Sequence, residues 1–246
     1  MTRQIVPNTG TIANIVSPAV QRSLVSDQVF RLLAESILTG RYGPGELLPT
    51  QRALAAEHGV NMASVREAVK RLEQLHLVES RQGEGMRVRD WRFHGGLDVI
   101  THLLFQAGGF DPETSRSLFE ARTLMLREAA RLAADRRSEE QSEQLAGLAV
   151  RFAAEKDPTA AQGIDFEFFS VIVDAADNVV FRLIMNSIRD IYFDHAEAFT
   201  RMFSARGRLG PLYEDASRAI AEHDPAAAAR AVEAIATKQA RRLTAK

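Results

Sequence analysis

LPTQRALAAEHGVNMASVREAVKRLEQL, residues 48–75, contains the pattern from which the N-terminal architecture can be worked out. Thr50 is a suitable N-cap for a short helix over 51–57, and Gly59 ends that helix. Asn61 then caps a second helix, which continues to the end of the quoted residues. Two short helices joined by a turn that contains glycine are typical of a helix-turn-helix, a motif whose second helix enters the major groove of DNA.

The residues on either side complete a winged helix. Before the motif, apolar residues recur at helical spacing over 24–38, and Gly40 stops this predicted helix. After the motif, residues 77–80 and 86–88 are typical of short strands that flank 81–85, a polar hairpin tip with two glycines. We therefore expect three helices followed by a two-stranded wing.

The chain as a whole is predicted to be mainly α. Residues 1–22 mix Thr, Asn, Ser and Pro without sustained periodicity, which indicates a mobile arm. The winged helix-turn-helix is expected over 23–90, and a linker over 91–96. Residues 97–246 show helical periodicity and no strand-like alternation, and breaks rich in Gly, Pro and Asp divide them into about seven helices. We expect an all-α helical bundle there.

Composition excludes several classes of protein. The 246 residues include no cysteine, which rules out disulfides, zinc-thiolate sites and thiol nucleophiles. No run approaches the roughly 18 apolar residues of a membrane helix, and no secretory signal is present, so we expect a cytoplasmic protein without a membrane partner. Residues 1–92 carry 12 Lys and Arg against 9 Asp and Glu, whereas the remainder carries 19 against 23. A basic front suits a DNA-contacting part.

Side chains at the start of the second helix, on the preceding helix and on the wing are the candidates for DNA contact. They are Arg52, Asn61, Met62, Ala63, Ser64, Arg66, Arg81, Gln82 and Gly83. Ser64 and Arg66 suit phosphates, Arg52 suits the backbone or a guanine, and the wing tip suits a minor groove. The alternative is a solvated charged helix beside an ordinary hairpin, which the order of the four elements disfavours.

The same residues resemble a known family. The runs at 48–55, 65–68 and 81–85 are similar to the N-terminal domain of GntR-family regulators, and the helical remainder is similar to the FadR branch of that family. The resemblance implies a homodimer that binds a palindromic double-stranded DNA operator, with a helical domain that binds an effector. Met62 stands where the family usually has an arginine that reads guanine, so operator preference is expected to differ.

The resemblance also bears on metal binding. Many members of the branch hold a metal with an aspartate, a histidine four residues later and two later histidines. Asp165 is present, but Phe169, Tyr213 and Ile235 occupy the other positions. A lone carboxylate does not hold a divalent metal without nitrogen partners, so we predict no metal and no cofactor.

Apolar and aromatic residues replace the metal ligands. The runs at 164–169 and 183–186, with Tyr192, are similar to the acyl-CoA-responsive members of the branch. This resemblance implies a long-chain acyl-CoA effector, and the expected contacts are Phe166, Phe168, Phe169, Ile172, Met185, Asn186, Ile188, Tyr192 and Tyr213. A plain structural core is the alternative for any one of these residues.

The favoured interpretation is a repressor of fatty-acid metabolism genes that an acyl-CoA releases from DNA. Two alternatives keep this architecture: a sensor of a carboxylate metabolite, and a repressor without a ligand. For the lipid effector itself, a free fatty acid is the alternative to an acyl-CoA. An enzyme is disfavoured, and no catalytic residue is proposed, because the chain shows no phosphate-binding glycine loop, no nucleophile turn and no metal-ligand cluster.

Overall fold

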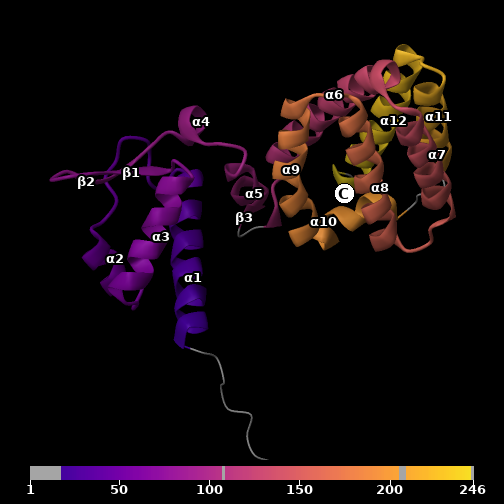
Figure 1. Cartoon of the computed structure of the whole chain (residues 1–246). Helices are drawn as coiled ribbons and strands as arrows, with labels where there is room; N and C mark the ends of the chain where they lie inside the picture. Colours follow the sequence, from indigo (N-terminus) through magenta and orange to yellow (C-terminus); the bar gives the residue numbers. More distant parts are fainter. Residues whose placement is uncertain (1–17, 107–108, 205–208, 245–246) are drawn as a thin grey trace, which may run out of the picture. The chain divides into compact units, whose positions relative to one another are not determined.

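The structure is a computed structural model that describes residues 18–106, 109–204 and 209–244 (Figure 1). It divides into two compact units between Val99 and Ile100, each of which is described by itself. The N-terminal unit contains helices, a short hairpin and one further helical turn. Its elements are α1 (Pro18–Leu38), α2 (Gln51–Glu57), α3 (Met62–Gln74), β1 (Val78–Arg81), β2 (Gly85–Val88) and α4 (Trp91–His94).

The helix-turn-helix forms where the sequence predicts it. Helix α2 has the expected bounds, and the Thr50 side chain caps it by accepting a hydrogen bond from the Ala53 N–H at 3.2 Å. Helix α1 begins at Pro18, so it includes the last residues of the arm expected over 1–22, and the rest of that arm lies outside the described residues. Helix α4 lies within the range that was expected to be a linker.

The core of this unit lies between α1, α3 and the wing. Phe30 and Leu33 of α1 are buried, as are Val65 and Leu72 of α3. Their helical spacing gives each helix one apolar face, and burial of those faces stabilises the unit. At the edge of this core, Arg71 of α3 donates a hydrogen bond to the Asp27 carboxylate of α1 at 2.7 Å and lies over the Phe30 ring.

The wing is a regular antiparallel hairpin (Figure 1). Its register pairs Val78 with Val88 and Arg81 with Gly85, as the expected strands require. Gly83 and Gly85 have φ values of +84° and +94°, which residues with a Cβ rarely adopt, so glycine is needed at this tip. The Leu48 N–H donates to the Met86 carbonyl at 2.8 Å, which ties the segment before α2 to the wing.

The C-terminal unit is a helical bundle. Its described residues form eight α-helices, one more than expected, together with a 3-10 turn and two very short strands. The elements are α5 (Val99–Leu104), β3 (Phe105–Gln106), β4 (Gly109–Phe110), α6 (Pro112–Arg136), α7 (Glu139–Ala154), α8 (Pro158–Ala175), α9 (Val179–Asp194), α10 (Ala196–Thr200), η1 (Arg201–Phe203), α11 (Gly210–Ala221) and α12 (Pro225–Thr244).

Local capping explains where these helices begin. The side chains of Asp111, Ser138, Asp157 and Asn178 each accept a backbone hydrogen bond at the start of α6, α7, α8 and α9. Proline at the first position of α6 and α8 fixes the backbone where no intrahelical donor is needed. The additional helix arises at His195, where the backbone breaks between α9 and α10 without a Gly or Pro to mark the position.

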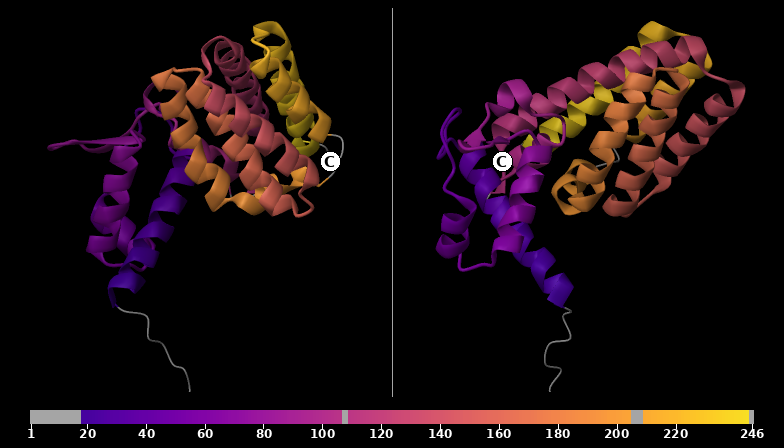
Figure 2. Two further views of the ribbon diagram at one scale, coloured as in Figure 1. Left: turned by 45° about the vertical axis from the view of Figure 1, so that its right-hand side comes forward. Right: turned by 60° about the vertical axis from the view of Figure 1, so that its left-hand side comes forward.

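Helices α6 and α12 pack along each other, as the views in Figures 1 and 2 show, and α7, α8 and α11 complete the core. The strands β3 and β4 pair over two residues each, too few to produce the alternation by which strands are recognised in a sequence. Within the described ranges, no helix is both long and apolar enough to cross a membrane.

Candidate DNA interface and candidate effector site

The first candidate site is the outward face of α3. Ser64, Val65 and other residues of one face are buried against α1 and α2, whereas Ala63, Arg66 and Lys70 on the other face are exposed. Met62 is half-buried at the start of the helix. A recognition helix needs such an arrangement, because the face that enters the groove must be free of the protein core.

Ser64 is the exception among the predicted DNA contacts. It is only 2% exposed, and its hydroxyl has no hydrogen-bond partner among the described residues. Helical geometry turns it inward, because it lies on the same face as the buried Ala68 and Leu72. In this structure the Ser64 hydroxyl therefore has no free surface for the predicted contact with a phosphate.

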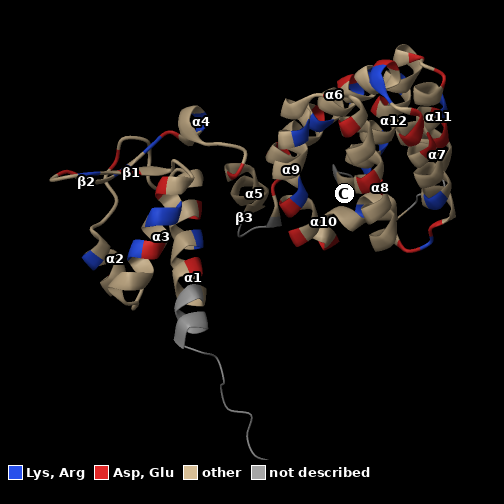
Figure 3. Ribbon diagram, in the orientation of Figure 1, with Lys and Arg blue, Asp and Glu red and all other residues tan. Residues whose placement is uncertain are grey.

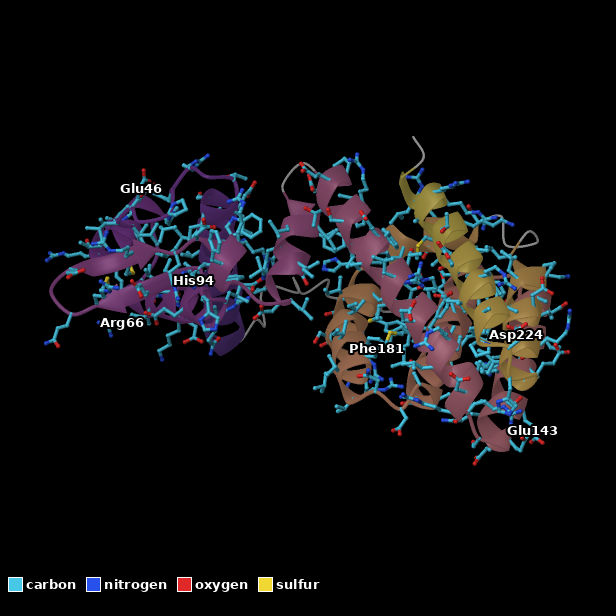
Figure 4. All side chains as sticks on the ribbon, turned by 90° about the horizontal axis from the view of Figure 1, so that it is seen from above. Glu46, Arg66, His94, Glu143, Phe181 and Asp224 are labelled. Atoms are coloured by element: carbon cyan, nitrogen blue, oxygen red, sulfur yellow. The ribbon has the colours of Figure 1, made fainter. Side chains whose placement is uncertain are left out.

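The remaining predicted contacts have free surface. Arg52 and Arg66 are exposed, and Figure 3 marks Lys and Arg positions in blue along the ribbon of both α2 and α3. Figure 4 labels Arg66. The Asn61 side chain is partly occupied, because its Oδ1 accepts a hydrogen bond from the Ser64 N–H at 2.9 Å.

The wing tip is exposed at Gln82 and Gly83. Arg81 forms ion pairs with Glu79 at 2.9 Å and with Glu84 at 3.8 Å, so a DNA phosphate would compete with two carboxylates for it. Both pairs are on the surface, where each contributes little. Arg81 therefore remains available to a phosphate.

The second candidate site is a buried polar cluster around Asp165 of α8. Asp165 is 1% exposed, and its Oδ2 accepts a hydrogen bond from the Tyr192 hydroxyl of α9 at 3.0 Å. Its Oδ1 accepts one from Tyr213 of α11 and another from the Gln239 amide of α12, the latter at 2.6 Å. The same amide also donates to the Tyr213 oxygen at 3.0 Å. Four helices thus meet at one carboxylate.

Both phenols in this cluster are donors. Burial, reinforced by the neighbouring Asp165 charge, raises the pKa of Tyr192 and of Tyr213 well above the ordinary value. Their hydroxyls therefore keep their protons and stabilise the carboxylate of Asp165.

Arg122 of α6 completes the cluster. Its Nη2 lies 3.7 Å from Asp165 Oδ2, and its guanidinium lies over the Phe169 ring. Its Nη1 is buried and has no hydrogen-bond partner among the described residues. A buried donor that lacks a hydrogen-bond partner destabilises the protein. A ligand atom that accepts a hydrogen bond from this nitrogen would remove that cost, and this would strengthen ligand binding.

The groups around Asp165 are hydrogen-bond donors rather than metal ligands. The phenols and the amide nitrogen direct hydrogens at both carboxylate oxygens, whereas a divalent ion needs lone pairs from several ligands. In the described part of the chain, no group of three or more His, Asp or Glu side chains gathers in a metal-binding arrangement. On α12, Gln239, one turn after Ile235, is the residue that donates a hydrogen bond to Asp165.

A cavity of about 30 Å³ lies beside this cluster. Five residues predicted to bind the effector line it, namely Phe166, Phe169, Met185, Ile188 and Tyr192. Arg122, Met125, Leu126 and Asp165 complete the lining.

The other four predicted effector contacts do not line this cavity. Phe168 and Ile172 are fully buried on α8, Asn186 is exposed, and Tyr213 lies behind Asp165, where its ring stacks on that of Phe152 with centroids 3.9 Å apart. Aromatic spacing alone does not separate core from cavity, because both faces of a buried helix are apolar.

Sequence reasoning missed Arg122 and Gln239, although the sequence contains a signal for them. Arg122 continues the buried stripe of α6 between Phe119 and Leu126, and Gln239 continues that of α12 after Val232 and Ile235. A polar residue on an apolar stripe points into the core and needs a partner there.

A winged helix-turn-helix with a free recognition helix, in a chain with a separate helical unit, defines a DNA-binding transcription regulator. Comparison with known proteins agrees. The model of the gntR family of bacterial regulatory proteins matches residues 25–88, and the FCD domain model matches residues 117–238. The chain belongs to the gntR family of bacterial regulatory proteins.

Relatives and one solved structure extend this finding. The HTH-type transcriptional regulator Mce2R of Mycobacterium tuberculosis is 38% identical over 89% of this chain and 90% of its own. A fatty acid metabolism regulator protein of Cronobacter sakazakii is 25% identical over 73% of this chain and 77% of its own. The structure of Lar, which controls expression of the agr system of Listeria monocytogenes, shares the fold, with a TM-score of 0.55 and 19% identity over 89% of this chain and 95% of that one.

Proposed function

We propose that the helical unit binds a long-chain acyl-CoA and that this binding releases the regulator from operators of fatty-acid metabolism genes. The observation that carries the proposal is the buried Nη1 of Arg122, which has no hydrogen-bond partner within the described ranges and belongs to a residue that lines a mainly apolar cavity. The similarity to a fatty acid metabolism regulator protein also supports it.

The two charged residues that line the cavity favour a ligand whose hydrogen-bond acceptor is neutral. Arg122 and Asp165 already compensate each other at 3.7 Å. A thioester carbonyl can accept hydrogen bonds from Nη1 without adding charge, whereas a free carboxylate would leave one buried negative charge in excess, which is costly. This difference favours an acyl thioester over a carboxylate metabolite.

The apolar walls of the cavity favour a hydrocarbon chain as ligand. The cavity must widen to admit such a chain, so one of its walls has to move. A cavity of about 30 Å³ has room for little more than a water molecule. Of the three helices that line the cavity, α9 has the fewest buried residues, namely Met185, Ile191 and Tyr192. We propose that it moves outward to admit the chain, and each methylene that becomes buried contributes about 0.8 kcal/mol.

Release from DNA requires a second copy of the chain. One winged helix covers a single half-site, and specific affinity generally comes from pairing two across a palindrome, so we propose a homodimer. The ligand weakens DNA binding because it prefers a conformation in which the two recognition helices no longer match the half-site spacing. Analytical ultracentrifugation should show a dimer at micromolar concentration, and a monomer there would contradict the proposal.

Titration calorimetry with acyl-CoAs of two, eight and sixteen carbons tests the effector directly. We expect affinity to rise with chain length, by up to about 15-fold for every two methylenes buried. Acetyl-CoA should not bind measurably. Free palmitate and citrate serve as the fatty-acid and carboxylate arms. Equal binding of all three acyl-CoAs, or binding of citrate alone, would reject the acyl-CoA proposal.

A pair of matched variants separates a specific site from detergent-like effects of the lipid. Ile188 is half-buried and lines the cavity, whereas Val150 on α7 is 65% exposed and does not line it. Ile188→Asp should abolish palmitoyl-CoA binding, because it places an unpaired carboxylate in the apolar wall. Val150→Asp should bind as the unaltered chain does. If both variants bind equally well, the cavity is not the site.

A further inference from the structure

The outward face of α3 begins with two apolar side chains. Met62 is half-buried and Ala63 is exposed, and they occupy the first two positions of the helix. Of the adjacent polar side chains, Asn61 is partly occupied because its Oδ1 accepts from the Ser64 N–H, and Ser64 itself is buried. The first turn therefore presents mainly hydrocarbon to a DNA groove.

The first turn of α3 lies where a recognition helix contacts DNA bases. In a helix-turn-helix, the N-terminal residues of the second helix are those that reach base edges. The exposed Arg66 lies one turn further on and is free for a phosphate or a guanine. Met62 and Ala63 are thus placed for base contact but have no strong hydrogen-bonding group.

The major groove offers one apolar feature for such side chains to recognise. Among the four bases only thymine carries a methyl group at the groove edge, and apolar side chains contact it. We propose that Met62 and Ala63 determine operator specificity by packing against thymine C5-methyl groups. Each operator half-site then has thymine at the base pairs beneath the first turn of α3.

The experiment starts from operators selected out of random DNA with the full-length chain. Each thymine of the selected half-site is then replaced, one at a time, by deoxyuridine, which lacks the methyl group but keeps the hydrogen-bonding edge. We expect the Kd to rise about fourfold at each thymine whose methyl is contacted. Deoxyuridine at thymines outside the half-sites should leave the Kd unchanged.

Two substitutions assign the contact to its residue. In Met62→Ala, the penalty for deoxyuridine should disappear at one thymine and persist at the others, and thermal melting checks that the variant is folded. Met62→Arg should change the selected base from thymine to guanine at that position, because arginine pairs with the guanine edge.

Two results would overturn the proposal. One is a selected half-site without thymine at the position that responds to Met62→Arg. The other is a Kd that stays unchanged with deoxyuridine at every thymine of the half-site.

Discussion

Replacing Tyr213 with phenylalanine is the sharpest test of the buried cluster. The ring fits the same space and keeps its stacking on Phe152, so the substitution removes only the hydroxyl. Asp165 then loses a donor, and one hydrogen of the Gln239 amide loses its acceptor. A hydrogen bond to a charged group contributes about 1.5–3 kcal/mol, so we expect the helical unit to lose about 2 kcal/mol of stability.

Thermal unfolding followed by circular dichroism measures this loss. For a domain of this size, 2 kcal/mol corresponds to a fall of about 4–8 °C in Tm. Tyr42 in the N-terminal unit provides the control, because its hydroxyl forms no hydrogen bond among the described residues. Tyr42→Phe should leave the Tm within about 1 °C of its original value.

A double-mutant cycle identifies the partner of the Tyr213 hydroxyl. In an Asp165→Asn background the carboxylate is absent, so Tyr213→Phe should cost less than half of what it costs in the unaltered chain. An equal cost in both backgrounds, or a loss below about 0.5 kcal/mol in the unaltered chain, would refute the reasoning that the hydroxyl stabilises the Asp165 charge.

Three further results are expected. Arg52→Ala or Arg66→Ala should weaken binding to all DNA sequences and reduce the slope of log Kd against log salt by about 0.9 for each phosphate that the arginine had neutralised; an unchanged slope would contradict a phosphate role. A strong chelator should leave DNA affinity and Tm unchanged, and elemental analysis that found a stoichiometric metal would disprove this. Stability should fall as the pH rises above about 10, because burial raises the pKa of Tyr192 and Tyr213, so these phenols ionise first in the unfolded chain. Replacing either tyrosine with Phe should reduce that fall, as measured by denaturant unfolding at about pH 9 and about pH 11.

Local signals explain what the sequence predicts well. Thr50 and Asn61 cap helices whose bounds follow from neighbouring residues, and the glycines at 83 and 85 fix a turn of defined geometry. Each of these features depends on contacts within a few residues, so the winged helix can be predicted before its packing is known.

Contacts between distant helices explain what the sequence does not predict. Asp165 meets Gln239, 74 residues later, and no periodicity in either helix pairs the two positions. The inward orientation of Ser64 likewise becomes evident only when its helix face is placed against α1 and α2. The break at His195 has no Gly or Pro to mark it, and the stacking of the His195 ring on Phe105, 90 residues earlier, is a contact between distant segments.

The proposal that an acyl-CoA controls DNA binding is tested most directly by fluorescence anisotropy of a labelled operator bound to the full-length chain. Palmitoyl-CoA should lower operator affinity by about tenfold or more, within the usual range of coupling between two binding sites. Acetyl-CoA at the same concentration should have no effect, because a two-carbon acyl group gains almost no burial energy. Equal release by palmitoyl-CoA and acetyl-CoA, or release by neither, would contradict the account.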